Sequence, residues 1–167
     1  MKSIYHGRVW KFGDSVSTDT IAPGRYLSLR ANPAEYAKHV LEAARPEFPE
    51  KVQKGDFVVA GKNFGCGSSR EIAPIIIKIS GVEAIIAKSF GRIFYRNAIN
   101  NGMLLIQCDT DQLSDGDLIN VDIQKGEIRK EGDCNPMLIF VLPEKELKII
   151  EQGGLLQYID RFNSLDA

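Results

Sequence analysis

The sequence predicts an α/β fold in which helices flank a mixed β-sheet. Two features indicate it: strand-length apolar runs alternate with helical stretches as far as Cys108, and closely spaced strands follow that point. Alternation of strand and helix is typical of parallel strands joined by crossover helices. Residues 1–167 are expected to form a single domain, because 44% of them are hydrophobic and a chain of this length fits one core.

The expected strands are short runs rich in apolar and β-branched residues. They are residues 3–12, 56–60, 82–87, 103–106, 118–123, 125–130 and 137–142. The runs 118–123 and 125–130 are expected to form a hairpin with Gly126 at its turn, because glycine accepts the positive φ of tight turns.

The expected helices have apolar residues at helical spacing or a recognisable start or stop signal. They are residues 34–44, 68–80, 89–99, 144–152 and 155–162. Asn32 or Pro33 would open the first helix. The second would begin with a capping box, since Glu71 follows Ser68 by three residues, and would end at Gly81. The remaining segments, expected to be turns, loops or a frayed tail, are 13–33, 45–55 and 163–167.

The bulk composition excludes several classes of function. Lysine and arginine number 21 against 22 acidic residues, so the net charge is −1 and no basic field attracts nucleic acid or anionic lipid. The first residues lack the apolar core of a signal peptide. No run approaches the roughly 18 apolar residues of a membrane-spanning helix. A cytoplasmic protein with no membrane or nucleic-acid partner is therefore expected.

The three cysteines, Cys66, Cys108 and Cys134, do not form a recognisable framework. An odd number of distant cysteines without a Cys-x-x-Cys pair is typical of reduced thiols. A zinc or iron–sulfur site would need about four clustered ligands. The chain is therefore expected to hold no metal or other cofactor of its own.

The stretch richest in chemistry is the glycine loop, residues 61–71, with the sequence GKNFGCGSSRE. Its glycines let the backbone approach a ligand closely. Ser68, Ser69 and Arg70 follow at an expected helix start, where free N–H groups and the helix dipole favour an anion. The planar fork of arginine suits a carboxylate. The loop is therefore predicted to bind a small carboxylate or phosphate, and its residues alone leave open whether it also acts on that ligand.

Familiar catalytic loops fit this stretch poorly. The only two histidines, His6 and His39, are not near it, which disfavours a serine hydrolase. Neither a phosphate-binding Gly-Lys-Ser/Thr nor a dinucleotide fingerprint occurs. Cys66 could be an activated thiol, but a small buried residue in a tight loop is the favoured interpretation. Asp19, within the segment 16–27, could simply bond its own backbone in a turn.

Three segments together resemble the signature motifs of the small subunits of 3-isopropylmalate dehydratase, a family of the aconitase superfamily. They are the glycine loop, residues 14–27 (DSVSTDTIAPGRYL) and residues 89–102 (SFGRIFYRNAINNG). They occur in the family's order and cover residues 1–108. The resemblance implies a swivelling β/β/α domain of the aconitase C-terminal-domain type.

The resemblance also implies a reaction and a partner. Proteins of this family are small subunits of hydro-lyases that isomerise a 2-hydroxy-dicarboxylic acid by removing and re-adding water. A large subunit carries the 4Fe–4S cluster, which acts as Lewis acid on the leaving hydroxyl. The expected reaction is 3-isopropylmalate to 2-isopropylmalate in leucine biosynthesis, with activity only in the two-subunit complex. A homo-oligomer is an alternative state of the isolated chain.

By position, the resemblance assigns roles to five residues. Ser68 would be the base that takes a proton from the carbon beside a carboxylate. Arg70, with Ser69, would hold that carboxylate. Asp19 matches the family's active-site aspartate. Arg30 falls, within a one-residue gap, where aconitase places a second substrate-binding arginine.

One position departs from the family pattern. The motif normally continues Arg-Glu-His-Ala, and Ile72 stands here in place of the histidine. Related small subunits act on homoaconitate or 2,3-dimethylmalate, so these acids are alternative substrates. An isopropyl arm would favour Leu29, and a carboxylate arm would favour Arg30. A non-catalytic anion-binding module is the alternative from a different class.

Overall fold

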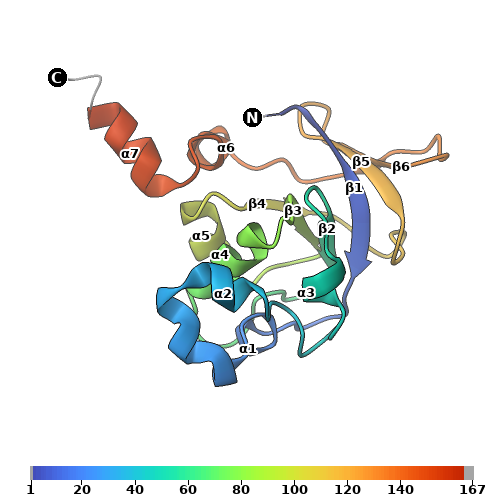
Figure 1. Ribbon diagram of the computed structural model, residues 1–167. Helices are drawn as coiled ribbons and strands as arrows, with labels where there is room; N and C mark the ends of the chain where they lie inside the picture. The colour runs from blue at the N-terminus through green and yellow to red at the C-terminus, as the bar shows by residue number, and fades with distance from the viewer. Residues whose placement is uncertain (1, 164–167) are drawn as a thin grey trace.

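The computed structural model describes residues 2–163 and confirms the α/β fold (Figure 1). One seven-stranded sheet runs through the molecule in the order β4-β3-β2-β1-β5-β6-β7. Its parallel group is β1 (Ile4–Lys11), β2 (Phe57–Ala60), β3 (Ala84–Ala87) and β4 (Leu104–Gln107). Its antiparallel group, which pairs with the other edge of β1, is β5 (Leu118–Asp122), β6 (Glu127–Lys130) and β7 (Met137–Leu138).

The central strands are short and wholly apolar because both of their faces are covered. All four residues of β2 and all four of β3 are buried. Parallel strands covered by helices read as continuous hydrophobic runs, which is why the sequence locates them well. The hairpin of β5 and β6, with Gly126 at a φ of 68° in its turn, is also confirmed.

Helices and one 3-10 helix connect the strands. They are α1 (Thr18–Ile21), η1 (Gly24–Ala31), α2 (Pro33–Ala37), α3 (Phe48–Lys51), α4 (Ile72–Ile79), α5 (Arg92–Asn100), α6 (Glu144–Glu151) and α7 (Leu155–Asn163). In Figure 1, α6 and α7 lie at the opposite end of the view from α1 and α2. Most of the expected tail, residues 164–167, lies outside the described residues.

The expected helix over 34–44 is wrong beyond Ala37. Asn32 does cap the helix, since its side chain accepts from the Glu35 N–H. The chain then turns, and Leu41 adopts a φ of 57° and donates its N–H to the carbonyl of Ile21 at 3.0 Å. The helical spacing of apolar residues therefore reflects buried turns, in which a tertiary hydrogen bond replaces a helical one.

The start of the expected helix over 68–80 is also wrong. The helix α4 begins only at Ile72, and no side chain caps it. The capping box of Ser68 and Glu71 does not form, because the hydroxyl of Ser68 lies against Thr18 instead. The expected end at Gly81 is confirmed by its φ of 100°.

Four further segments differ from expectation. The loop 16–33 contains α1 and η1, and the connection 45–55 contains α3, whose Phe48 packs edge-on against Trp10 with ring centroids 5.0 Å apart. The helix expected from residue 89 begins at Arg92. The strand expected over 137–142 is limited to Met137–Leu138.

The sheet topology determines where the site lies. Because β1, β2 and β3 are parallel, the loops that follow them leave the same edge of the sheet, where α/β proteins place ligands. These loops contain Asp19, the glycine loop and residues 88–91. Among the described residues, no helix is long and apolar enough to cross a membrane.

Candidate active site

Backbone hydrogen bonds join the glycine loop to the segment after β1. The N–H of Gly65 donates to the carbonyl of Val16 at 2.7 Å, and the N–H of Thr18 donates to the carbonyl of Cys66 at 2.8 Å. The residues Ser17 and Cys66 form a parallel bridge. Two motifs that are about fifty residues apart in the sequence therefore form one rigid surface.

No residue other than glycine fits at position 65 without strain. Its φ is 77°, and a Cβ built there would lie 2.1 Å from a ring carbon of Phe94 in α5. Phe94 is buried and packs edge-on against Phe64, with ring centroids 5.3 Å apart. Because it lacks a side chain, Gly65 lets the loop pack directly on α5, and this contact fixes the position of the loop residues that follow.

Ser68 is exposed, and its hydroxyl lies against the side chain of Thr18. The Oγ1 of Thr18 donates to the carbonyl of Ser68 at 2.9 Å and lies 3.3 Å from the Oγ of Ser68. A hydroxyl carries a single proton. Thr18 uses its own proton on the carbonyl, so it accepts from the hydroxyl of Ser68. Thr18 is only 1% exposed, and sequence reasoning did not identify it.

Arg70 lies across the segment Asp19–Ala22. Its Nη2 forms an ion pair with the Oδ1 of Asp19, and its Nη1 donates to the carbonyl of Ala22 at 2.5 Å. The side chain of Arg70 is 19% exposed and that of Asp19 is 60% exposed. The guanidinium has five N–H groups, so these two contacts leave donors for a ligand.

Tyr36, on α2, completes the setting of Arg70 and is a second residue that sequence reasoning missed. It is fully buried, and its hydroxyl donates to the carbonyl of Pro23 at 3.0 Å. Burial raises the pKa of Tyr36, although the nearby charge of Arg70 opposes the shift. Tyr36 and Arg70 thus hold the carbonyls of two consecutive residues, Ala22 and Pro23.

Asp19 does not make the local turn contact that was considered for it. Ser17 caps α1, because its Oγ accepts from the N–H of Thr20 at 3.1 Å. The carboxylate of Asp19 is therefore available to Arg70. The structure thus brings together Ser68, Arg70 and Asp19 of the predicted set.

Ser69 and Arg30 are not fixed in the same way. Both are exposed, and neither side chain makes a hydrogen bond or ion pair with another residue in the range 2–163. Arg30 lies in the last turn of η1. The structure therefore leaves both side chains free to meet a ligand, with no contact that preorganises them.

The expected buried position of Cys66 is wrong, because the residue is only half-buried. Its Sγ donates to the carbonyl of Ser15 at 3.5 Å. Ile72, in the first turn of α4, packs against the hydrophobic core. No group of three histidine, cysteine, aspartate or glutamate residues among the described positions could hold a metal ion.

The chain is similar to known proteins over most of its length. The family model described as the aconitase C-terminal domain matches residues 17–111. The 3-isopropylmalate dehydratase small subunit 2 of Archaeoglobus fulgidus is 52% identical over 159 residues, which cover 95% of this chain and 96% of that protein. The methanogen homoaconitase small subunit of Methanothermobacter thermautotrophicus is 51% identical over 95% of this chain and 92% of that protein.

The chain is also similar to a solved structure of this family. The crystal structure of 3-isopropylmalate dehydratase from Methanocaldococcus jannaschii matches with a TM-score of 0.94 at 45% identity, over 98% of this chain and 97% of that one. The fold implied by the three motifs is therefore confirmed. Relatives of nearly equal identity are named for different substrates, so overall identity does not distinguish between those substrates.

Proposed function

Because this chain belongs to the aconitase C-terminal domain family, we propose that it is the small subunit of a two-subunit hydro-lyase. The proposed reaction is the isomerisation of 3-isopropylmalate to 2-isopropylmalate by dehydration and rehydration. The observation that carries the proposal is the joint placement of Ser68, Arg70 and Asp19 on two backbone-linked loops. The partner is a large subunit, as the names of the relatives imply for those proteins.

In the assembled enzyme, a 4Fe–4S cluster on the large subunit would supply the Lewis acid for the leaving hydroxyl. This chain supplies the other half of the site. The free N–H groups of Arg70 bind a substrate carboxylate, while its contacts with Asp19 and Ala22 hold the guanidinium in place. Asp19 therefore acts by positioning Arg70.

The exposed hydroxyl of Ser68 first loses its own proton to solvent, and the resulting alkoxide takes the proton from the carbon beside that carboxylate. A serine hydroxyl is a poor base, so the alkoxide needs stabilisation by nearby donors and positive charge. The hydroxyl of Thr18 and the cation of Arg70 are the available groups. Thr18 can turn its proton from the Ser68 carbonyl to the Ser68 Oγ, because both oxygens lie within 3.3 Å of it.

The variable arm of the substrate meets η1 in this proposal. Leu29 packs against the core, whereas Leu27 is 41% exposed and Arg30 is exposed. Leu27 is therefore better placed than Leu29 to contact an isopropyl group. Arg30 would contact a carboxylate arm, as in homoaconitate.

A substrate panel tests the proposal. The chain and its large subunit are purified separately and combined, and hydration of unsaturated diacids is followed by ultraviolet absorbance. We expect the highest kcat/KM for the isopropyl-substituted acid and no activity from this chain alone. A higher kcat/KM for the homoaconitate intermediate would replace the substrate assignment. An assembled complex that hydrates no diacid would favour the non-catalytic anion-binding module.

A further inference from the structure

The described arginines divide into two groups by their partners. Those with an ion pair or a side-chain hydrogen bond are Arg8, Arg25, Arg45, Arg70, Arg129 and Arg161. Within residues 2–163, Arg30, Arg92 and Arg96 have neither. The net charge is −1, so an excess of cations over anions does not explain the unpaired group.

Arg92 and Arg96 form a patch on α5. They are four residues apart, so they lie one turn from each other on one helix face, and both are exposed. Ile93, between them in sequence, is 52% exposed. We call Arg92, Ile93 and Arg96 the α5 patch.

The α5 patch adjoins the glycine loop. A hollow of about 500 Å³ is lined by the α5 patch, Gly91 and the loop residues Asn63, Gly65, Cys66 and Gly67. Gly67 immediately precedes Ser68. The surface beside the proposed base is therefore continuous with the α5 patch.

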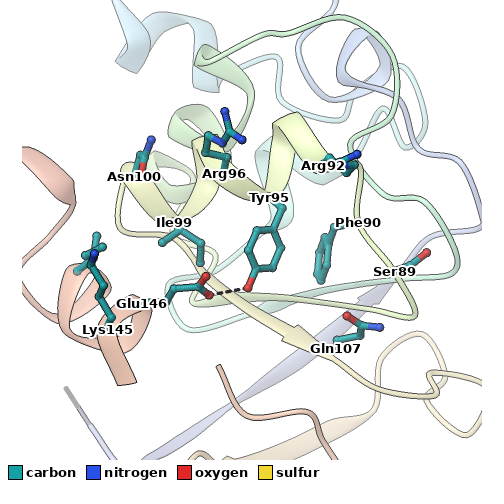
Figure 2. Close-up of a pocket in the computed structure, with 11 residues that line it drawn as sticks. Ser89, Phe90, Arg92, Tyr95, Arg96, Ile99, Asn100, Gln107, Lys145 and Glu146 are labelled. Atoms are coloured by element: carbon teal, nitrogen blue, oxygen red, sulfur yellow. Dashed lines mark hydrogen bonds between the residues drawn. The ribbon is translucent and has the colours of Figure 1, made fainter. Parts of the chain in front are cut away.

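Arg92 and Arg96 also line a second hollow, of about 540 Å³, together with Tyr95 and Glu146. The carboxylate of Glu146 is already engaged there, because it accepts a hydrogen bond from the hydroxyl of Tyr95 at 2.6 Å. Figure 2 shows the guanidinium groups of Arg92 and Arg96 pointing away from this pair. Glu146 therefore does not serve as the partner of either arginine.

The chemistry of the α5 patch fits a protein surface better than a small anion. Two cations alone would suit a free carboxylate, but an exposed isoleucine between them gains nothing from one. An interface typically combines an apolar contact with complementary charges around it. The expected partner surface therefore presents acidic side chains to the arginines and an apolar side chain to Ile93.

We propose that the α5 patch is a docking surface for the large subunit. This inference rests on the proposed function, in which a large subunit covers Ser68. A chain that covers Ser68 also covers the adjoining hollow, because Gly65 and Gly67 line it. The ion pairs formed there would hold the partner's half of the site beside Ser68.

Titration of one purified subunit with the other, in low and high salt, tests the docking surface. The double variant Arg92→Glu/Arg96→Glu is expected to raise the Kd by about 100-fold, because each reversed charge meets a like charge. Arg92→Gln/Arg96→Gln should weaken binding less and reduce its salt dependence. The matched control Lys54→Glu/Lys125→Glu reverses two exposed charges elsewhere and should bind as the wild type does. Thermal melting of each isolated variant checks that it is folded.

The outcomes separate this inference from the proposed function. An unchanged Kd for both arginine variants overturns the docking surface, even if the enzyme is active. An unchanged Kd with a raised KM also overturns it, because the arginines would then bind substrate. If the wild-type complex assembles but hydrates no diacid, the proposed function fails while the Kd values still decide the docking surface. A wild-type chain that does not bind its large subunit overturns both.

Discussion

The glycine loop and η1 contribute to the same proposed site but are held in different ways. The glycine loop is fixed by short backbone hydrogen bonds to the segment 15–18 and by direct packing on Phe94. The 3-10 helix η1 has no buried residue, and side-chain contacts such as the Arg25–Glu42 ion pair and the stacking of Tyr26 on His39 hold it. The rigid loop suits the chemical step, and the more loosely held helix suits discrimination among substrates.

Within the glycine loop, substitution of Gly65 should have the largest effect on stability. Gly65→Ala places a Cβ 2.1 Å from a ring carbon of Phe94 at a φ of 77°. Overpacking and an unfavourable φ together should cost about 3 kcal/mol, which corresponds to a decrease in Tm of roughly 6–12 °C.

Two other glycines separate the causes of that loss. Gly116 has a φ of 83° and no atom within 4 Å of the point where a Cβ would lie, and Gly13 has open space without a positive φ. Gly116→Ala should show only the cost of the backbone conformation, and Gly13→Ala should be nearly neutral. Equal losses of Tm in all three variants would contradict the close-packing argument.

Replacing Asp19 tests whether the Arg70 guanidinium needs the ion pair with Asp19 to stay in position. Asp19→Asn should lower kcat/KM of the complex about 100-fold, because small displacements of a positioned group are costly. Stability should change by less than about 1 kcal/mol, since the carboxylate is 60% exposed and exposed ion pairs contribute little. Glu144→Gln, which breaks the exposed pair with Lys148 on α6, should leave both quantities unchanged. Full activity of Asp19→Asn would remove Asp19 from the site.

Arg30 should affect selectivity without affecting stability. Its side chain contacts no other described residue through a hydrogen bond or ion pair, so Arg30→Ala should change the free energy of unfolding by less than about 0.5 kcal/mol. The kcat/KM for a substrate with a carboxylate arm should fall about tenfold relative to that for the isopropyl substrate. A parallel change for both substrates would place Arg30 outside the selective contact.

The smallest effect concerns the contacts that hold η1. Burial acts to raise the pKa of Glu42, but hydrogen bonds from His39, Arg25 and Tyr26 outweigh it and lower the pKa below the ordinary 4.5. A lowered folded-state pKa means that the stabilisation is present above pH 4.5 and is lost as the pH falls through the folded-state value. Glu42→Gln should therefore lower Tm by a few degrees at pH 7. The difference in Tm between Glu42→Gln and the wild type should disappear in acid. A difference in Tm that does not depend on pH would contradict the stabilising role of the ionised Glu42 carboxylate.

The sequence predicted the strands better than the helices around the site. The runs that form β2 and β3 are apolar on both faces. At that length, this pattern indicates a strand that is buried on both sides. The helix expected over 34–44 failed because the Leu41 N–H bonds to Ile21, a contact that local periodicity does not contain. The capping box at Ser68 failed for a related reason, because Thr18 takes the place of the local partner.

The site itself was predictable only in part. Ser68 and Arg70 lie in one distinctive loop, so their proximity follows from the sequence. The ion pair of Arg70 with Asp19 joins residues fifty-one positions apart, and only the order of the parallel strands places them together. Thr18 and Tyr36 carried no signal, because a buried threonine or tyrosine reads as core in the sequence. The substrate roles of Ser68, Ser69, Arg70, Asp19 and Arg30 remain proposals.

In the proposed mechanism the Ser68 alkoxide takes the substrate proton in the assembled complex, and Ser68→Ala removes the oxygen that would take it. The turnover of the variant complex is compared with that of the wild type and of Ser114→Ala, which alters an exposed serine outside the two loops of the proposed site. We expect a decrease in kcat of about 10²–10⁴-fold with an unchanged Kd for the large subunit. A kcat equal to that of the wild type in a fully assembled complex would contradict it.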